Sequence, residues 1–352
     1  MKFDRYPSTT DASLKAWNAA DELILHYIEN ENIKCNAPII FNDRFGYLAC
    51  HLIEKSPQVI GNYRSQEKAI DLNLRNNDLP QTEYYSPLLT GAKPTDLGII
   101  KIPKSLDLFQ FMLHHLFDKL SDDGLVICGF MTKYFSPQFL TIAEAYFENI
   151  IQTKAQKKAR LMILQGKKDK PKVDLIESFN WNQHSYQQYL GVFSSGHIDY
   201  ATQFFLEHLN VSTNEQNILD LASGNGVIAR FVRDRNSEAT IHLCDDSWLA
   251  IASSKLNLEN GKNIFHYADN LEQIENNSLD LVVSNPPFHF DFETNIDITF
   301  SLFKEVKTKL KSGGRFELVA NRHLPYKPVL EELFKDVIIS ADNKKFIIYS
   351  CI

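Results

Sequence analysis

The second half of this sequence repeats the pattern of the first. Residues 147–164 (FENIIQTKAQKKARLMIL) align without gaps to residues 334–351 (FKDVIISADNKKFIIYSC), and each segment has two apolar strands joined by a turn with two lysines. This is the pattern of a β-hairpin. Residues 116–129 and 306–320 share the end of a helix, a turn and a strand. A repeat this long predicts two copies of one α/β domain that arose by duplication.

Length and composition fit two globular domains. The chain has 352 residues, and 44% of them are hydrophobic, which is enough for two cores. It has neither the ~20 uninterrupted apolar residues of a membrane span nor an apolar signal core at its start, so we expect no membrane contact and a cytoplasmic location. The five cysteines are widely spaced, which is typical of buried thiols in a reducing compartment. Acids and histidines show no ligand spacing, and we predict no metal.

The net charge of −7 argues against a protein that coats nucleic acid indiscriminately. A local exception runs from Lys154 to Lys172, where lysines and one arginine face a single acid, Asp169. Such a run fits a solvated linker or a contact to nucleic-acid phosphates. Lys157 and Lys158 are the candidate phosphate contacts in this run.

A glycine loop follows the first predicted strand of the second half. Residues 217–230 read NILDLASGNGVIAR, so Asp220 stands at the tip of a strand and Gly224 and Gly226 open a helix. Glycines let the backbone approach a ligand closely, and a helix start presents free N–H groups. We expect Asp220 to meet a cationic or hydroxyl-bearing part of that ligand.

Two further acids follow the next predicted strands. Asp245 ends the strand 241–244, where an acid is placed to accept the ribose hydroxyls of a nucleoside cofactor. Asp269 follows the strand 264–267, where an adenine amine would bind. Strands that alternate with helices predict a mostly parallel sheet with helices on both faces, closed by the antiparallel hairpin. Loops at the carboxyl ends of its strands would gather these acids at one edge.

The segment Asn285, Pro286, Pro287 and Phe288 follows the apolar run 279–283. The Asn285 amide oxygen and the Pro286 carbonyl give two acceptors for one planar NH₂ group, and the prolines keep the loop rigid. Phe288 offers a face on which a base stacks. A simple turn is the alternative reading of Asn-Pro-Pro.

Glycine spacing alone does not decide the cofactor. Gly224, Gly226 and Ala229 also satisfy the dinucleotide pattern G-x-G-x-x-A of NAD enzymes. Hydride transfer has no use for the acceptor pair at Asn285, whereas methyl transfer to an exocyclic amine needs it. We therefore predict tandem Rossmann-like, class I methyltransferase domains that use S-adenosylmethionine (SAM). Guanine, adenine, cytosine and glutamine amines all remain possible acceptors of the methyl group at this point.

The first half lacks these features. Its equivalent segment, PIIFNDRFGYLAC, keeps Gly46 but has Arg44 and Phe45 in the loop, and IPKS (102–105) replaces the acceptor pair. We expect residues 1–168 to be a degenerate copy without a cofactor site that docks or supports the substrate. Residues 169–185 are expected to form a linker, and residues 186–352 the catalytic domain.

Five segments carry a family resemblance: 5–25 (RYPSTTDASLKAWNAADELIL), 191–199 (GVFSSGHID), 285–289 (NPPFH), 319–326 (VANRHLPY) and 344–349 (KKFIIY). Together they resemble the RsmC/RlmG family of bacterial ribosomal RNA guanine-N(2) methyltransferases, and segment 5–25 favours the large-subunit branch. The resemblance implies an inactive first domain, a SAM-binding second domain and the 2-amino group of a guanine in 23S rRNA as the acceptor. A 16S rRNA guanine and an inactive RNA-binding assembly factor are the alternatives.

Other residues complete the predicted site. Phe193 caps the cofactor or packs in the core. His289 and Arg322 are candidate RNA contacts, although each also fits a solvated loop. Ala222 and Ser223 stand where the family loop usually has glycine and cysteine. Because alanine is suited to a negative φ, we expect this departure to lower SAM affinity and to leave the fold intact. No obligate protein partner is evident.

Overall fold

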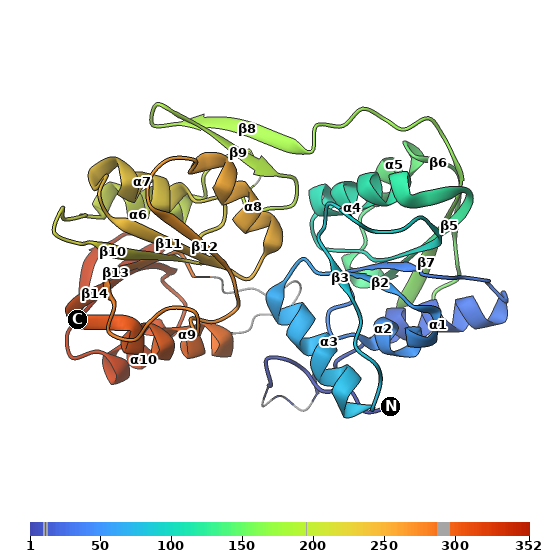
Figure 1. The fold of residues 1–352 in the computed structure, drawn as a ribbon, viewed down its shortest axis with the longest axis horizontal. Coiled ribbons are helices and arrows are strands. Elements are labelled where there is room, and N and C mark those ends of the chain that lie inside the picture. The colour runs from blue at the N-terminus through green and yellow to red at the C-terminus, as the bar shows by residue number, and fades with distance from the viewer. Residues whose placement is uncertain (10, 12, 195, 287–295) are drawn as a thin grey trace. The chain divides into compact units, whose positions relative to one another are not determined.

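The computed structural model describes residues 1–9, 11, 13–194, 196–286 and 296–352. The chain divides into two units, Met1–Leu175 and Ile176–Ile352. Each unit contains a seven-stranded sheet with helices on both faces (Figure 1). The prediction of two tandem α/β domains with mostly parallel sheets is confirmed.

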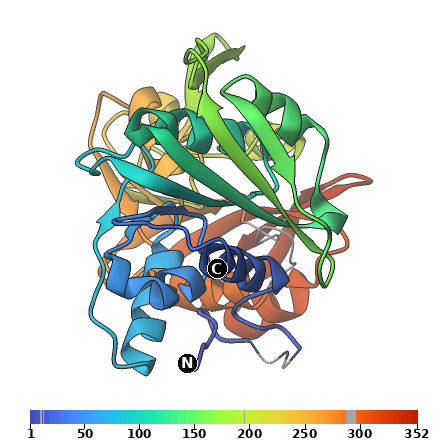
Figure 2. The same cartoon turned by 90° about the vertical axis from the view of Figure 1, so that its right-hand side faces the viewer.

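The first unit has the strand order β3-β2-β1-β4-β5-β7-β6, in which β7 is antiparallel to both neighbours. Helices cover both faces of this sheet (Figure 2). The strands are β1 (Ile39–Phe41), β2 (Gln58–Ile60), β3 (Tyr84–Tyr85), β4 (Thr95–Lys101), β5 (Leu120–Met131), β6 (Phe147–Gln152) and β7 (Ala159–Lys167). The α-helices are α1 (Ala19–Asn30), α2 (Tyr47–His51), α3 (Arg64–Asn76), α4 (Leu106–Lys119) and α5 (Gln138–Glu144).

The second unit repeats this order as β12-β11-β10-β13-β14-β16-β15, and β16 is the antiparallel strand. Its strands are β10 (Asn217–Leu221), β11 (Thr240–Asp245), β12 (Asn263–Tyr267), β13 (Leu279–Ser284), β14 (Leu310–Asn321), β15 (Val337–Asp342) and β16 (Phe346–Cys351). Its helices are α6 (Tyr200–His208), α7 (Val227–Arg235), α8 (Trp248–Asn257), α9 (Ile296–Lys309) and α10 (Tyr326–Leu333). The shared order bears out the predicted duplication.

The central strands of the second sheet are apolar on both faces because each face carries its own helical layer. Leu219 of β10 belongs to the cluster that contains Phe303 of α9, whereas Ile218 belongs to the cluster that contains Phe205 of α6. All four side chains are fully buried. The two-sided core holds the strands parallel and leaves their carboxyl-end loops at one edge.

The closing hairpins agree with the repeat seen in the sequence. Strands β6 and β7 pair antiparallel, and so do β15 and β16. Lys157 and Lys158 lie in the turn of the first hairpin with φ of 47° and 65°. Two successive left-handed residues give the tight turn that joins antiparallel strands without splaying them.

A second, smaller hairpin stands at the start of the second unit. Strands β8 (Ile176–Trp181) and β9 (His184–Tyr189) pair antiparallel, and β8 lies within the range 169–185 that the sequence suggested as a linker. Asn257, at the end of α8, fastens β9 to the glycine loop. Its side-chain amide donates to the carbonyls of Gln187 and Asn225, both at 2.8 Å, and its oxygen accepts from the Gln187 N–H at 2.8 Å.

We predict that Asn257→Ala lowers the free energy of unfolding by about 1–2 kcal/mol, because it leaves partly buried backbone groups of the hairpin and the glycine loop without partners. Urea denaturation followed by circular dichroism measures the change. Asn260→Ala is the matched control, since Asn260 is exposed three residues away, and should stay within about 0.5 kcal/mol of the parent. Equal stability of both variants would contradict the proposed role of Asn257 in holding β9 to the glycine loop.

Candidate active site at the carboxyl edge of the second sheet

Hydrogen bonds tie the loops at the carboxyl ends of neighbouring strands into one frame. The Ala222 N–H donates to the Cys244 carbonyl at 2.8 Å, which joins the loop after β10 to the end of β11. The Ala268 N–H donates to the Asp245 carbonyl at 3.0 Å, and the Ser284 hydroxyl donates to the Leu221 carbonyl at 2.7 Å. The structure therefore brings the ends of β10, β11, β12 and β13 together, as the sequence predicted.

Asp220 is fully buried at the end of β10. Its Oδ2 accepts from the Ala229 N–H at 2.9 Å, which satisfies an otherwise free donor in the first turn of α7. No donor among the described residues reaches its buried Oδ1. Burial is the main cause that raises the pKa of Asp220 to about 7. A buried carboxylate with one oxygen unsatisfied suits a cationic or hydroxyl-bearing ligand group.

The two glycines of the loop differ in their surroundings. Both have left-handed backbones, with φ of 55° at Gly224 and 81° at Gly226. A Cβ added to Gly226 would lie 3.0 Å from Leu258 and 3.3 Å from Ser254, so Gly226 is needed for packing against the α8 region. A Cβ added to Gly224 would meet nothing within 4 Å. Gly224 therefore borders open space at the carboxyl edge, where a ligand can approach the backbone.

Asp245, at the end of β11, supports the same loop. Its Oδ2 accepts from the Gly224 N–H at 2.9 Å, and its Oδ1 accepts from the Ser247 N–H at 2.8 Å at the start of α8. Burial is the main cause that raises the pKa of Asp245 to about 6. A carboxylate oxygen has two lone pairs, so each oxygen can accept one further hydrogen bond, for example from a ribose hydroxyl.

Asn285 follows β13 and is held by the start of α6. Its Nδ2 donates to Asp199 Oδ2 at 3.1 Å and to Thr202 Oγ1 at 2.9 Å. Both amide hydrogens are therefore engaged, and the amide oxygen lies on the other side of the group. Pro286 follows as a buried residue, with a carbonyl but no N–H. This arrangement leaves two acceptors in succession.

The other predicted residues of the cofactor and substrate site are described in part. Pro287, Phe288 and His289 lie outside the described residues. Asp269 follows β12 by two residues and is half-buried. Phe193 is 69% exposed, in a segment that Gln188 holds through the Ser194 carbonyl at 3.3 Å.

Two of the predicted RNA contacts, Arg322 and Lys157, already have protein partners. Arg322 forms an ion pair with Asp342 and donates to the Asn343 carbonyl, so it is tied to the β15–β16 turn. Lys157, in the first unit, lies 2.9 Å from Glu22. Lys158 is exposed in the same turn. Exposed pairs of this kind are weak, so the lysines remain accessible to a stronger anion.

Sequence reasoning missed the residues that hold the site together. Asp199 and Thr202 contact Asn285, yet Phe193 was the one residue of this region that the sequence assigned to the site. The buried Gln188 accepts from Asn225 of the glycine loop at 2.7 Å. An acid just before a helix is a recognisable N-cap signal, but nothing in the sequence connects that helix to Asn285.

The first unit has different residues at the equivalent positions. Gly46 and Gly226 are both N-caps, with φ of 80° and 81°, and the strand registers extend the match from them. The equivalents of the site residues Gly224, Asp245 and Asn285 are Arg44, Gly61 and Lys101. The register thus makes Lys101 the equivalent of Asn285. The sequence comparison had placed the segment 102–105 there, and this is corrected.

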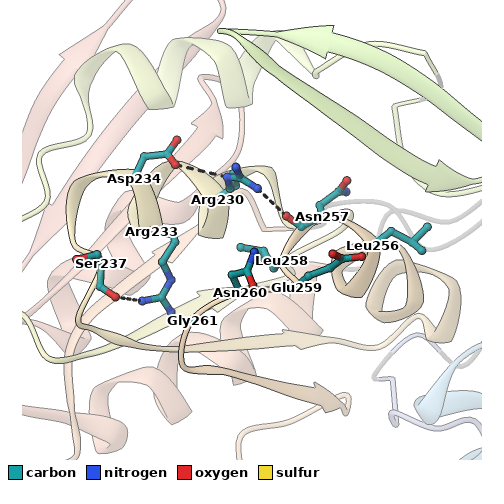
Figure 3. Close-up of a pocket in the computed structure, with 10 residues that line it drawn as sticks. All are labelled: Arg230, Arg233, Asp234, Ser237, Leu256, Asn257, Leu258, Glu259, Asn260 and Gly261. Carbon is teal, nitrogen blue, oxygen red and sulfur yellow. Dashed lines mark hydrogen bonds and ion pairs between the residues drawn. The ribbon is translucent and has the colours of Figure 1, made fainter.

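A pocket of about 370 Å³ lies beside α7 in the second unit (Figure 3). Its lining comes from the end of α7 and the segments that precede β11 and β12, at the amino ends of the strands. Arg230 donates to the Asn257 carbonyl at 3.0 Å, and Arg233 donates to the Ser237 carbonyl at 2.7 Å (Figure 3). Arg230 therefore joins α7 to the end of α8, and Arg233 joins it to the loop before β11. Among the described residues, no cluster of three His, Cys, Asp or Glu side chains could hold a metal, and no described helix is long and apolar enough to cross a membrane.

The fold and the site define a class, the Rossmann-like methyltransferases. Residues 185–350 match the family model "Methyltransferase small domain", and residues 1–169 match "RLMG N-terminal domain". The Ribosomal RNA large subunit methyltransferase G of Pseudoalteromonas translucida (strain TAC 125) is 30% identical to this chain, with 99% of the chain and 94% of that relative covered. The chain belongs to the family of ribosomal RNA large subunit methyltransferase G.

Among solved structures, the T. thermophilus 16S rRNA N2 methyltransferase RsmC, in complex with AdoMet and guanosine, is similar to this chain with a TM-score of 0.78. The two are 20% identical, and the match covers 93% of this chain and 91% of that one. This likeness supports the fold over both units.

The backbone at Ala222 contradicts one expectation. Its φ is 58°, in the left-handed region, whereas the sequence analysis expected a negative angle. The backbone follows the left-handed path despite the side chain, because the N–H groups of Ala222 and Ser223 both donate to the Cys244 carbonyl. A left-handed alanine carries strain of about 1–2 kcal/mol.

We predict that Ala222→Gly raises the free energy of unfolding by about 0.5–1 kcal/mol, since relief of this strain exceeds the extra entropy of glycine in the unfolded chain. Ala229→Gly, inside α7, is the control and should lose about 1 kcal/mol. Thermal and urea denaturation measure both changes. A loss of stability in Ala222→Gly would show that the position carries no strain.

Proposed function

We propose that this chain transfers a methyl group from SAM to the exocyclic 2-amino group of a guanine in 23S rRNA, in the cytoplasm. Membership of the large-subunit methyltransferase G family supports 23S rRNA as the substrate. The observation that carries the chemistry is the orientation of Asn285. Its amide hydrogens are bound by α6, and its oxygen is left next to the Pro286 carbonyl as an acceptor pair.

An acceptor pair suits this substrate because the guanine 2-amino group is a weak nucleophile. Its lone pair is delocalised into the ring, and hydrogen bonds from both of its N–H groups to Asn285 and Pro286 favour a pyramidal nitrogen. Orientation of this kind can contribute about 7–11 kcal/mol to catalysis at most. A strong base is not needed before attack, since the nitrogen becomes acidic only as the new bond forms.

The residues of the glycine loop fit the cofactor. SAM, when bound, supplies the electrophilic sulfonium methyl group. Asp220 has a buried oxygen available for a cationic or hydroxyl group, Gly224 borders open space, and Asp245 has lone pairs for ribose hydroxyls. Asp269 would bind the adenine amine, and the exposed Phe193 would cover the cofactor.

The RNA would be recognised by both units. We propose that Phe288 stacks on a guanine taken out of its helix, that Pro287 and His289 contact the substrate beside it, and that Arg322, Lys157 and Lys158 contact phosphates. The first unit, with Arg44, Gly61 and Lys101 at the equivalent positions, would serve in docking and support rather than in SAM binding.

The direct test incubates purified protein with isotopically labelled SAM and rRNA from a strain that lacks the gene, followed by nucleoside mass spectrometry. We expect N2-methylguanosine in 23S rRNA, and mapping of the fragment identifies the nucleotide. Label in 16S rRNA, or on adenine or cytosine, would show that the methyl acceptor differs from the proposed guanine of 23S rRNA. An absence of SAM binding in isothermal titration would instead indicate an inactive RNA-binding factor.

We predict that Asn285→Ala lowers the single-turnover rate of methyl transfer by at least roughly 10²-fold and leaves the SAM dissociation constant near normal, because the variant loses orientation alone. Asp245→Ala should weaken SAM binding by about 1.5–3 kcal/mol. Asn214→Ala is the control, because Asn214 is exposed before β10, at the amino edge of the sheet. It should match the parent in both measurements. Parental turnover in Asn285→Ala would remove the proposed role of the amide.

SAM affinity should also rise with pH. The pKa of Asp220 is raised to about 7, and a cationic ligand group favours the ionised carboxyl, so affinity is strongest above this pKa and falls as the carboxyl gains a proton. For one such group, the affinity should drop about tenfold from pH 8 to pH 6. Titration calorimetry measures the slope, and Asp220→Asn should bind more weakly with a smaller pH dependence. A flat profile in the parent would contradict this role of Asp220.

A further inference from the structure

Two side chains of α6 bind the amide group on which the proposed function depends. Asp199 Oδ2 and Thr202 Oγ1 both accept from Asn285 Nδ2, at 3.1 Å and 2.9 Å. We propose that Asp199 and Thr202 are positioning residues that fix the Asn285 oxygen as the acceptor for the substrate amine. This inference rests on the proposed function and assigns a role to residues that would not touch the substrate.

The need for positioning follows from the symmetry of the amide. A side-chain amide turned by 180° exchanges its oxygen for an NH₂ group, which would then face the NH₂ group of the substrate as donor against donor. An ionised carboxylate can only accept. Asp199 therefore selects the orientation in which the Asn285 nitrogen faces α6 and its oxygen faces away.

Asp199 is itself fixed by the helix. It is the N-cap of α6, and the same Oδ2 accepts from the N–H groups of Ala201 at 3.0 Å and Thr202 at 3.3 Å. Thr202 is buried in the first turn. A hydrogen bond to a charged group is stronger than one between neutral groups and polarises its partner. The carboxylate should thus raise the electron density on the Asn285 oxygen, which strengthens it as an acceptor when the substrate nitrogen becomes positive.

The first unit provides an internal comparison. Its first helix, α1, has Asn18 as N-cap and Asp21 three residues later, and Asp21 lies 2.7 Å from Lys101, the equivalent of Asn285. Both units therefore have a side-chain contact between the start of the first helix and the end of the fourth strand. In the first unit it is a largely buried ion pair, and an ammonium group has no acceptor to offer. The fold tolerates that pair, so its architecture does not require an amide at this position.

Thr202→Val is the sharpest test because it removes one acceptor of the amide hydrogens with little change in shape. With saturating SAM and RNA, we expect a clear slowing of single-turnover methyl transfer, of up to roughly 10²-fold. The SAM dissociation constant and the melting temperature should stay close to those of the parent. Thr202→Ser keeps the hydroxyl and should restore most of the rate. Asp199→Asn keeps a cap of the helix without the charge and should also slow transfer.

A double-mutant cycle separates positioning from a general structural role. In an Asn285→Ala background, Thr202→Val should change the residual rate by less than about twofold, since the hydroxyl acts through the missing amide. The inference is overturned if Thr202→Val and Asp199→Asn both transfer methyl at the parental rate, or if Thr202→Val slows both backgrounds equally. An inactive parent protein would instead refute the proposed function, so the two failures are distinguishable.

Discussion

Parallel pairing of the central strands is the constraint on which the rest of the structure depends. Because β10 to β13 run in one direction between two helical layers, every loop at their carboxyl ends lies at the same edge. The loops there bind one another through backbone groups and through Asp245, while Asp220 holds the start of α7. A rigid edge of this kind can hold donors and acceptors in place before any ligand arrives, and such preorganisation is what orientation catalysis requires.

The same edge occurs in both units, with different side chains at the positions of the site. The strand order, the left-handed glycine before the second helix and the side-chain contact between the first helix and the fourth strand are common to both units. Where the second unit has Gly224, Asp245 and Asn285, the first has Arg44, Gly61 and Lys101. In the first unit, the ion pair between Asp21 and Lys101 occupies the place that the contact of Thr202 with Asn285 occupies in the second.

Much of the second unit could be predicted from its sequence. The apolar run 279–283 predicted β13, and residues 217–230 predicted β10, since buried parallel strands read as continuous apolar segments. The glycines after β10 predicted the start of α7. The strand β14 begins at Leu310, where the sequence indicated the end of a helix and a turn, because it first pairs with Leu279 and then continues past an irregularity. The hairpin of β8 and β9 and the helices α6 and α10 were missed, as their sequences are mixed in polarity.

The site was predicted in part. Glycines and acids at strand ends are local signals, so Gly224, Asp220 and Asp245 could be found from spacing alone. Asp199 could not be linked to Asn285, because 86 positions separate them and only the packing of α6 brings them together. Ala222 was misjudged because residue preference argues against a left-handed alanine, whereas hydrogen bonds to the Cys244 carbonyl hold the loop on that path.

The central claim is that an acceptor pair at Asn285 and Pro286 holds the 2-amino group of a guanine. The most direct test compares two 23S rRNA transcripts that differ only at the mapped target, one with guanosine and one with inosine, which lacks that amine. The account predicts methyl transfer to the guanosine transcript alone, with SAM bound equally well in both reactions. Equal methylation of the inosine transcript would contradict it.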